Sequence, residues 1–196
     1  MKILWLDINS SYSHSSVALP AIHAQVSDRE DWEWCVVRGT INDNPGAIAA
    51  AVAEHKPDII AATFWLFTHN MQIEVLSRAV QLLENVKIIC GGPEFLGDNE
   101  DFLRRNPFVT AVIRGEGEEA LPEFLDKIDR RSSWQSIEGL CWMSEDGYHE
   151  CISSSSVTVL VKVHGSIESV RITILKHPGN LRIDQHCLYI LNLQFH

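Results

Sequence analysis

The stretch Ile88-Ile89-Cys90-Gly91-Gly92-Pro93-Glu94 decides the fold, because it is an apolar run that ends in two glycines, a proline and an acid. An uninterrupted apolar run of this length is typical of a strand buried on both faces of a sheet. Similar runs occur at residues 3–8, 32–37, 59–65 and 111–113. The run at 32–37 alternates at its start, which predicts a strand nearer an edge of the sheet.

Segments with helical spacing separate these runs. Asn44-Pro45 is typical of a helix start, with an N-cap residue followed by proline at the first helical position, and Asp98 can cap a short helix. The apolar positions at helical spacing include Ile48, Val52, Met71, Val75, Leu76, Ala79, Leu82, Leu83, Phe102, Leu103, Ala120, Leu121, Phe124, Leu125 and Ile128. Five strands alternating with five helices predict an α/β domain over residues 1–136, with a doubly wound, flavodoxin-like, five-stranded parallel sheet and helices on both faces.

The chain changes character after residue 136. Residues 137–151 predict a β-hairpin, because apolar and aromatic runs flank Glu145-Asp146-Gly147. Residues 152–196 predict a strand-rich tail of unknown role, with alternating valines from Val157 to Val163, a turn at Gly165-Ser166, alternation again at 170–174 and an apolar run at 188–195. The charge changes at the same boundary: residues 1–151 hold 24 acidic and 12 basic side chains, whereas residues 152–196 hold 2 and 4.

The composition excludes several classes of function. The formal net charge of −10 argues against binding to nucleic-acid phosphates, which requires clustered Lys and Arg. No apolar run approaches the roughly 18 residues of a membrane span, and the N-terminus lacks the pattern of a signal peptide. The five cysteines form no C-x-x-C pair, which excludes a zinc ribbon and a thioredoxin-type motif; they are Cys35, Cys90, Cys141, Cys151 and Cys187. These features predict a cytoplasmic protein without a bound metal of its own.

Four loops follow the carboxyl ends of the predicted strands, which is where doubly wound sheets bind ligands. Residues 7–16 are rich in short polar side chains and open a helix at Ser15 or Ser16, which favours either a polar ligand or simple N-capping. Residues 63–68 place a hydroxyl beside large rings, which favours either a large flat cofactor or a sheet-to-helix core. No glycine-rich phosphate loop follows the first strand, so a Walker or dinucleotide fingerprint is excluded.

The other two loops contain glycines. The pair Gly91-Gly92 lets a ligand or another stretch of backbone approach closely, and a Cβ at Gly92 is expected to collide with such a ligand. The loop from Arg114 to Glu119 combines glycines with acids at a helix start, where Glu118 and Glu119 are favourable to the helix dipole. A catalytic pair of carboxylates and a solvated capping cluster are both compatible with this pattern.

Together these residues resemble the cobalamin (vitamin B12)-binding domain of B12-dependent radical SAM (S-adenosylmethionine) proteins. The resemblance rests on the stretch from Ile88 to Glu94 and on Arg114-Gly115-Glu116-Gly117-Glu118, and it extends over residues 1–151. It implies a corrinoid held over the carboxyl edge of the sheet, with its nucleotide tail along the loop after the fourth strand. The cofactor-binding residues that it implies are Ser10, Ser11, Tyr12, Ser13, His14, Ser15, Thr63, Trp65, Leu66, Gly91, Gly92, Pro93, Glu94, Gly115, Glu116 and Gly117.

The sequence departs from the wider pattern in two places. Methionine-synthase-like cobalamin domains carry Asp-x-His-x-x-Gly after the first strand, whereas the corresponding residues here run from Asp7 to Tyr12 without the His or the Gly. The resemblance therefore does not imply which group, if any, the protein supplies as a ligand to cobalt. The C-x3-C-x2-C motif of radical SAM enzymes is also missing, so neither a [4Fe–4S] cluster nor S-adenosylmethionine is expected in this chain.

The expected function is therefore a cobalamin-binding module that is not catalytic by itself and that works with a radical SAM catalytic domain or protein. An alternative is a flavodoxin-like interaction or regulatory module that has lost ligand binding, because fold alone does not separate the two. A flavin- or nucleotide-binding oxidoreductase is less favoured, since the first loop lacks phosphate-binding glycines.

Overall fold

A computed structural model describes residues 1–11, 16–151, 154–163, 166–177 and 180–182. The chain divides into two compact units, residues 1–151 and residues 152–196. The expected residues Tyr12, Ser13, His14 and Ser15, Gly165 of the predicted turn and the apolar run at 188–195 lie outside the described residues.

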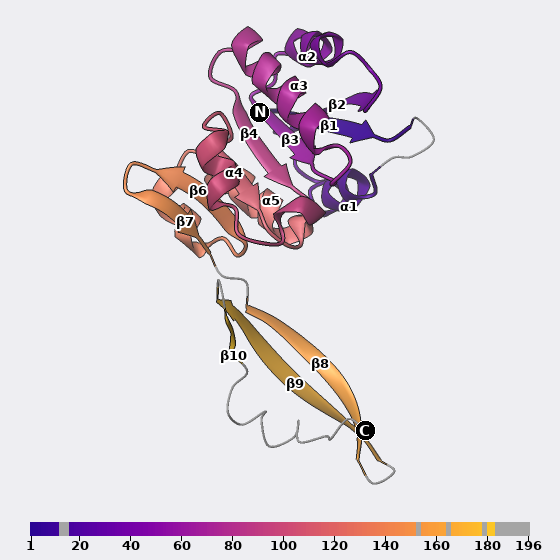
Figure 1. The fold of residues 1–196 in the computed structure, drawn as a ribbon, viewed down its shortest axis with the longest axis vertical. Helices are drawn as coiled ribbons and strands as arrows, with labels where there is room; N and C mark the ends of the chain where they lie inside the picture. Colours follow the sequence, from indigo (N-terminus) through magenta and orange to yellow (C-terminus); the bar gives the residue numbers. More distant parts are fainter. Residues whose placement is uncertain (12–15, 152–153, 164–165, 178–179, 183–196) are drawn as a thin grey trace. The chain divides into compact units, whose positions relative to one another are not determined.

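The first unit contains one mixed sheet of seven strands (Figure 1). The strands are β1 (Lys2–Asn9), β2 (Glu33–Thr40), β3 (Ile59–Thr63), β4 (Lys87–Gly91), β5 (Ala111–Ile113), β6 (Leu140–Ser144) and β7 (Gly147–Glu150). Their order is β2-β1-β3-β4-β5-β6-β7; the first five are parallel, and β6 and β7 are antiparallel to their neighbours. β2 lies at an edge, as predicted from its alternating start.

The predicted count of five strands is wrong, because the hairpin continues the same sheet. Val112 of β5 pairs with Cys141 of β6, so β5 is not an edge strand. An uncovered edge would leave a row of backbone N–H and C=O groups unpaired, and the hairpin removes that edge from β5. The glycine-rich loop after β5 therefore lies beside the hairpin as well as beside β4.

Five α-helices and two short 3₁₀ helices cover the sheet. They are α1 (Ala18–Gln25), α2 (Pro45–Glu54), α3 (His69–Leu82), α4 (Glu100–Arg105), α5 (Gly117–Lys127), η1 (Pro93–Phe95) and η2 (Arg131–Ser136). Successive strand residues point to opposite faces, so Leu4 and Leu6 of β1 join a core with α2, α3 and α4, whereas Ile3 and Trp5 join a core with α1 and α5. Figure 1 shows α2 and α3 together on one face. The doubly wound arrangement with helices on both faces is confirmed.

The helix starts agree only in part with those predicted from the sequence. Asn44 caps α2, because its side-chain oxygen accepts a hydrogen bond from the N–H of Ala47. Asp98 accepts from the N–H of Glu100 at 2.9 Å, although α4 takes the next residue, Asn99, as its N-cap. α1 begins at Ala18 rather than at Ser15 or Ser16.

The cap at Asn44 gives a first prediction. The Asn44→Ala variant is expected to lose about 1 kcal/mol of unfolding free energy, because one N–H of the first turn of α2 loses its acceptor. Urea unfolding followed by circular dichroism measures the difference. Asn42→Ala, at an exposed asparagine two residues earlier, is the matched control. Equal unfolding midpoints for the two variants would contradict the assigned cap.

The second unit contains a three-stranded antiparallel sheet in the order β10-β9-β8. Its strands are β8 (Ser154–Val163), β9 (Ser166–His177) and β10 (Asn180–Arg182), and Val159 pairs with Val170. The predicted strands at 157–163 and 170–174 are therefore present.

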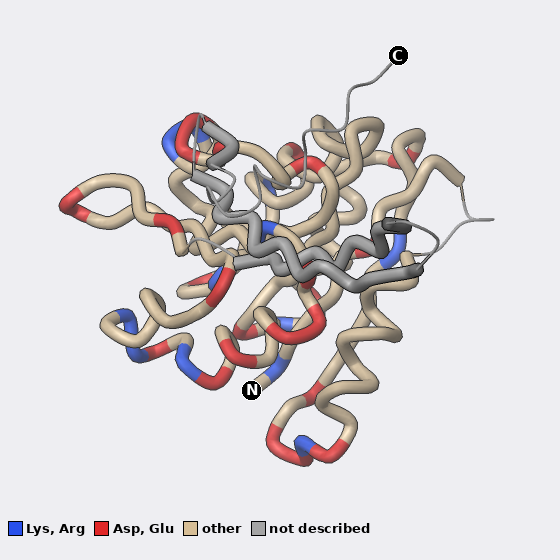
Figure 2. The backbone as a smooth tube through the Cα atoms, turned by 90° about the horizontal axis from the view of Figure 1, so that it is seen from below, with Lys and Arg blue, Asp and Glu red and all other residues tan. Residues whose placement is uncertain are grey.

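Basic residues are scattered among acidic ones along residues 1–151. Figure 2 shows Lys and Arg interleaved with Asp and Glu in that view, and most of these cations lie within ion-pair distance of a carboxylate. Within the described part of the chain, none of the helices is long and apolar enough to cross a membrane. The cytoplasmic location stays a prediction.

Candidate functional site

A cavity of about 250 Å³ opens at the carboxyl edge of the sheet, on the face that α1 and α5 cover. The loops after β3, β4 and β5 form its rim, together with the start of α1. Half of the residues expected from the sequence line this cavity: Thr63, Trp65, Gly91, Gly92, Pro93, Gly115, Glu116 and Gly117. The structure therefore brings three of the four predicted loops together at one place, and Ser16, the last residue of the first predicted loop, lines the same cavity.

Four of the expected residues do not line the cavity. Ser10 and Leu66 are exposed, and Ser11 is half-buried at the end of β1. Glu94 is directed toward the start of α3, where its Oε2 lies 3.0 Å from Nδ1 of His69. The carboxylate of Glu94 therefore lies against His69 and is not part of the cavity lining.

The floor of the cavity consists of four strand residues that are not among those expected to bind the cofactor. Trp5, Ala61, Ile89 and Ile113 come from four neighbouring parallel strands and belong to one core with α1 and α5. Strand alternation could have identified them, because side chains two residues apart share a face. The floor is apolar, whereas the rim consists mainly of glycines and polar residues.

The two glycines after β4 have different roles. A Cβ built on Gly91 would meet one neighbour, the carbonyl oxygen of Ile113, at an ordinary 3.6 Å. Gly91 shares its face with Ile89, so that Cβ would point to the cavity side of the sheet. Gly91 is thus the position where a side chain would enter the cavity without displacing protein.

Gly92 has no such freedom. Its φ is +108°, and an added Cβ would lie 2.6 Å from the carbonyl oxygen of Phe64 and 2.9 Å from the nitrogen of that residue. The expectation that a Cβ at Gly92 would collide with a ligand is therefore corrected. The close approach is by the backbone of the loop after β3, which also donates a hydrogen bond of 2.7 Å from the Phe64 N–H to the carbonyl oxygen of Gly91.

The loop after β3 is held by its own hydrogen bonds. The hydroxyl of Thr68 accepts from the N–H of Trp65 and donates to the carbonyl oxygen of the same residue, at 3.1 Å each. Gln72, which is fully buried, donates from Nε2 to the carbonyl oxygen of Thr63 at 2.8 Å. These contacts fix a loop that buries Phe64 but exposes three other apolar side chains: Trp65 is 37% exposed, Phe67 is 53% exposed and Leu66 is 83% exposed.

The loop after β5 has open space at Gly115 and places its acidic residues at the start of α5. Gly115 has a φ of +95°, and an added Cβ would have nothing within 4 Å. Glu116 is the N-cap residue of α5 without a side-chain capping bond, and Glu118 and Glu119 occupy its first turn. Acidic side chains at a helix start are favourable to the helix dipole, which agrees with the capping interpretation.

No resident metal site is found among the described residues, where no group of three or more His, Cys, Asp or Glu side chains could hold an ion. Cys90 lies between Ile89 and Gly91 beside the cavity, but its side chain belongs to the core with α2, α3 and α4 on the other face of the sheet. Its complete burial raises the pKa of its thiol far above the ordinary value. The side chain is therefore a neutral thiol at pH 7 and behaves as a small apolar group.

Two curated relatives of this chain are methyltransferases. The chain is 29% identical over 115 residues to an uncharacterized methyltransferase of Pyrococcus horikoshii, a match that covers 58% of this chain and 25% of that protein. It is 29% identical over 70 residues to the cobalamin-dependent radical SAM methyltransferase TokK of Streptomyces tokunonensis, which covers 36% of this chain and 10% of that protein. The chain thus spans a quarter or less of the length of these relatives.

Solved structures with the same fold come from cobalamin-dependent enzymes. The radical SAM methyltransferase TsrM of Kitasatospora setae, with cobalamin and a [4Fe–4S] cluster bound, matches with a TM-score of 0.59 at 17% identity over 85% of this chain and 31% of that one. The radical enzyme OxsB, with aqua-cobalamin and S-adenosylmethionine bound, matches with a TM-score of 0.62 at 15% identity over 78% of this chain and 22% of that one.

The family comparison covers the whole region that carries the cavity. Residues 5–125 match the B12 binding domain family. They include every residue that lines the cavity, from Trp5 in the floor to Leu121 in α5. The match includes all three rim loops and more than half of the chain. This protein therefore belongs to the B12-binding domain family.

Proposed function

We propose that residues 1–151 bind cobalamin at the carboxyl edge of the sheet, with the nucleotide tail of the cofactor in the cavity. The observation that carries this proposal is the glycine-rimmed cavity of about 250 Å³, which lies inside the region that matches the B12 binding domain family. Binding at the carboxyl ends of the strands is also the general position for ligands in doubly wound sheets.

The residues present fit such a ligand. Gly91 and Gly115 leave space where any other residue would place a side chain, so a flat or extended group can lie against the backbone. The apolar floor and the exposed ring of Trp65 offer contact area, and the rim supplies backbone polar groups and the Thr63 hydroxyl. A mostly apolar cavity with a few polar groups is typical of cofactor sites.

The residues of this chain bind and orient the cofactor. Gly91, Gly92 and Pro93 would hold the nucleotide tail from the loop after β4, and Gly115, Glu116 and Gly117 would complete the rim. Thr63 and Trp65 would contact the tail or the ring from β3 and the loop after it. Cobalamin, when bound, would supply a cobalt centre that can carry a methyl group, and the protein would supply binding and orientation.

The relatives of this chain suggest the kind of protein with which the cobalamin-binding module works. Relatives of this chain are cobalamin-dependent radical SAM methyltransferases, and the chain spans only a fraction of their length. We therefore propose that this module serves a radical SAM catalytic domain or protein, and that it binds corrinoid without turnover by itself. The exposed side chains of Ser10 and Leu66, which follow β1 and β3, offer contacts for such a domain at the same edge of the sheet.

The binding proposal is tested directly with hydroxocobalamin. The purified full chain is mixed with the cofactor and desalted, and the protein fraction is expected to retain the visible absorption of a corrinoid in about stoichiometric amount. The same mixture with flavin mononucleotide is expected to yield a colourless protein fraction, because no phosphate-binding glycine loop follows β1. A colourless fraction with full recovery of free cobalamin would remove the proposal and favour the interaction module without a ligand.

A further inference from the structure

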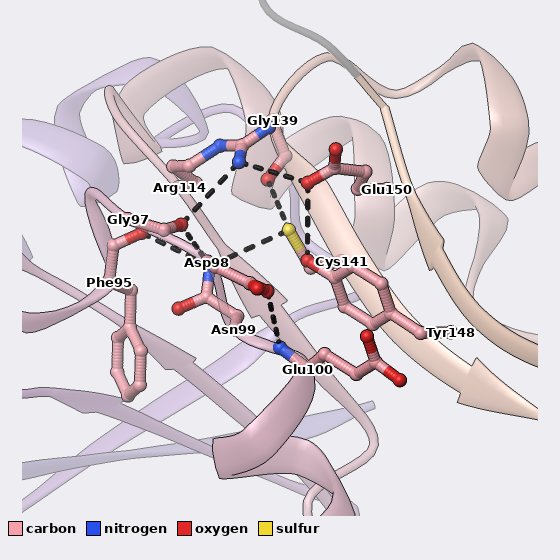
Figure 3. Close-up of polar contacts among 10 residues, drawn as sticks. All are labelled: Phe95, Gly97, Asp98, Asn99, Glu100, Arg114, Gly139, Cys141, Tyr148 and Glu150. Carbon is pink, nitrogen blue, oxygen red and sulfur yellow. Dashed lines mark hydrogen bonds and ion pairs between the residues drawn. The ribbon is translucent and has the colours of Figure 1, made fainter. Parts of the chain in front are cut away.

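A connected polar network joins side chains of the β6–β7 hairpin to the segments that follow β4 and β5. Arg114, directly after β5, donates from Nη1 to Oε2 of Glu150 in β7 at 3.0 Å, and the hydroxyl of Tyr148 donates to the same oxygen at 3.3 Å. On the other side, Nδ2 of Asn99 donates to the Sγ of Cys141 in β6 at 3.7 Å. Figure 3 shows these side chains converging from the hairpin and from the two loops beside it.

The same network reaches both glycine loops of the cavity. Asn99 donates to the carbonyl oxygens of Phe95 and Gly97, at 3.1 and 3.3 Å, in the segment that follows Gly91-Gly92-Pro93. Arg114 precedes Gly115, which lines the cavity, and its guanidinium also lies 3.5 Å from the carbonyl oxygen of Gly97. The network therefore joins the segment after β4 and the loop after β5 to each other and to the hairpin.

A backbone contact at the entrance to the hairpin strengthens this connection. Gly139 has a φ of +76°, and an added Cβ would lie 2.3 Å from the carbonyl oxygen of Arg114. The N–H of Arg114 donates to the carbonyl oxygen of Gly139 at 2.8 Å, and the N–H of Gly139 donates to that of Cys151 at 3.1 Å. The loop after β5 is thus held to the hairpin by main chain and by side chain at the same residue.

Burial makes the network sensitive to the loss of one member. The side chains of Arg114 and Glu150 are only 16% and 15% exposed, so the pair is screened less by water than the exposed ion pairs of the surface. Asn99 and Cys141 are buried. Burial raises the pKa of the Cys141 thiol and of the Tyr148 hydroxyl, so both stay neutral at pH 7. The ion pair of the network is the one between Arg114 and Glu150.

We propose that the hairpin, through Arg114, Glu150 and Asn99, holds the loops after β4 and β5 in the geometry that binds cobalamin. This inference rests on the proposed function. Arg114 and Glu150 are then positioning residues: they do not line the cavity, and they act through Gly115 and through the segment that follows Gly92. A binding site is precise only when a second layer of contacts fixes the groups that touch the ligand.

The Glu150→Gln variant tests the inference in the full chain. It keeps the shape of the side chain but removes the charge, and it is expected to bind hydroxocobalamin about tenfold more weakly under conditions in which denaturation shows it to be fully folded. Its amides at 91–99 and 114–118 are expected to exchange hydrogen faster in the absence of cofactor. Glu74→Gln, which breaks an exposed pair with Arg78 and changes the net charge equally, is the matched control.

A double variant separates positioning from a general loss of stability. If the pair acts as a unit, Arg114→Gln combined with Glu150→Gln binds about as weakly as either single variant, whereas independent effects would multiply. Tyr148→Phe is the substitute variant if Glu150→Gln fails to fold, because it removes only the hydroxyl that donates to Glu150. It is expected to weaken hydroxocobalamin binding about threefold.

The outcomes distinguish this inference from the proposed function. Absence of cobalamin binding by the wild-type chain would refute the proposed function, whatever the variants do. Wild-type binding together with unchanged affinity and unchanged loop exchange in the folded Glu150→Gln variant, or in Tyr148→Phe if that is the variant that folds, would overturn the positioning role.

Discussion

The Gly91→Val variant is expected to fold like the wild-type chain and to bind cobalamin about 100-fold more weakly, a loss of about 2.8 kcal/mol of binding free energy. The physical reason is the position of the missing side chain. A Cβ at Gly91 would have only the carbonyl oxygen of Ile113 nearby, at 3.6 Å, and it would point to the cavity side of the sheet. The valine would therefore occupy space that we assign to the cofactor.

Titration of the folded variant with hydroxocobalamin, followed by absorption, measures the loss. Gly91→Ala is expected to give a smaller loss in the same direction, because its side chain occupies less of the cavity. Ala50→Val, at an exposed position of α2 that does not line the cavity, is the control for a general effect of an added side chain. A folded Gly91→Val variant with wild-type affinity would place the ligand elsewhere.

The Gly92→Ala variant, one residue later, is expected to lose about 4 kcal/mol of unfolding free energy, because backbone strain and overpacking act together. The φ of +108° is unfavourable for alanine, and the new Cβ would lie 2.6 Å from the carbonyl oxygen of Phe64. This contact is with main chain, which cannot rotate away as a side chain can. A loss of this size is a large fraction of the stability of a domain.

Urea unfolding of Gly92→Ala beside Gly91→Ala measures this difference at neighbouring positions with the same change in chemistry. The expected result is a much lower midpoint for Gly92→Ala and a nearly unchanged midpoint for Gly91→Ala. Equal midpoints would show that the loop after β3 can move away from Gly92. Such a movement would also displace Trp65, whose backbone is held in that loop by Thr68.

The sequence alone determined the order of the elements in the first unit. The apolar runs at 3–8, 59–65, 86–90 and 111–113 became parallel strands, and the helical spacing from Met71 to Leu83 became α3. These patterns are local, because period and capping are properties of residues a few positions apart. The carboxyl edge as the ligand side follows from the same order, whereas the family resemblance rests on the residues of the glycine loops themselves.

The tertiary structure alone decided what each loop residue contacts. Gly92 must be glycine because of Phe64, which is 28 positions away in the chain, and Glu94 reaches His69 rather than the cavity. The partner of β5 was equally invisible in the sequence, since the alternation of a hairpin does not specify which strand its outer edge will join. Strand pairing and close backbone approach depend on residues far apart in the chain, and only the folded chain brings those residues together.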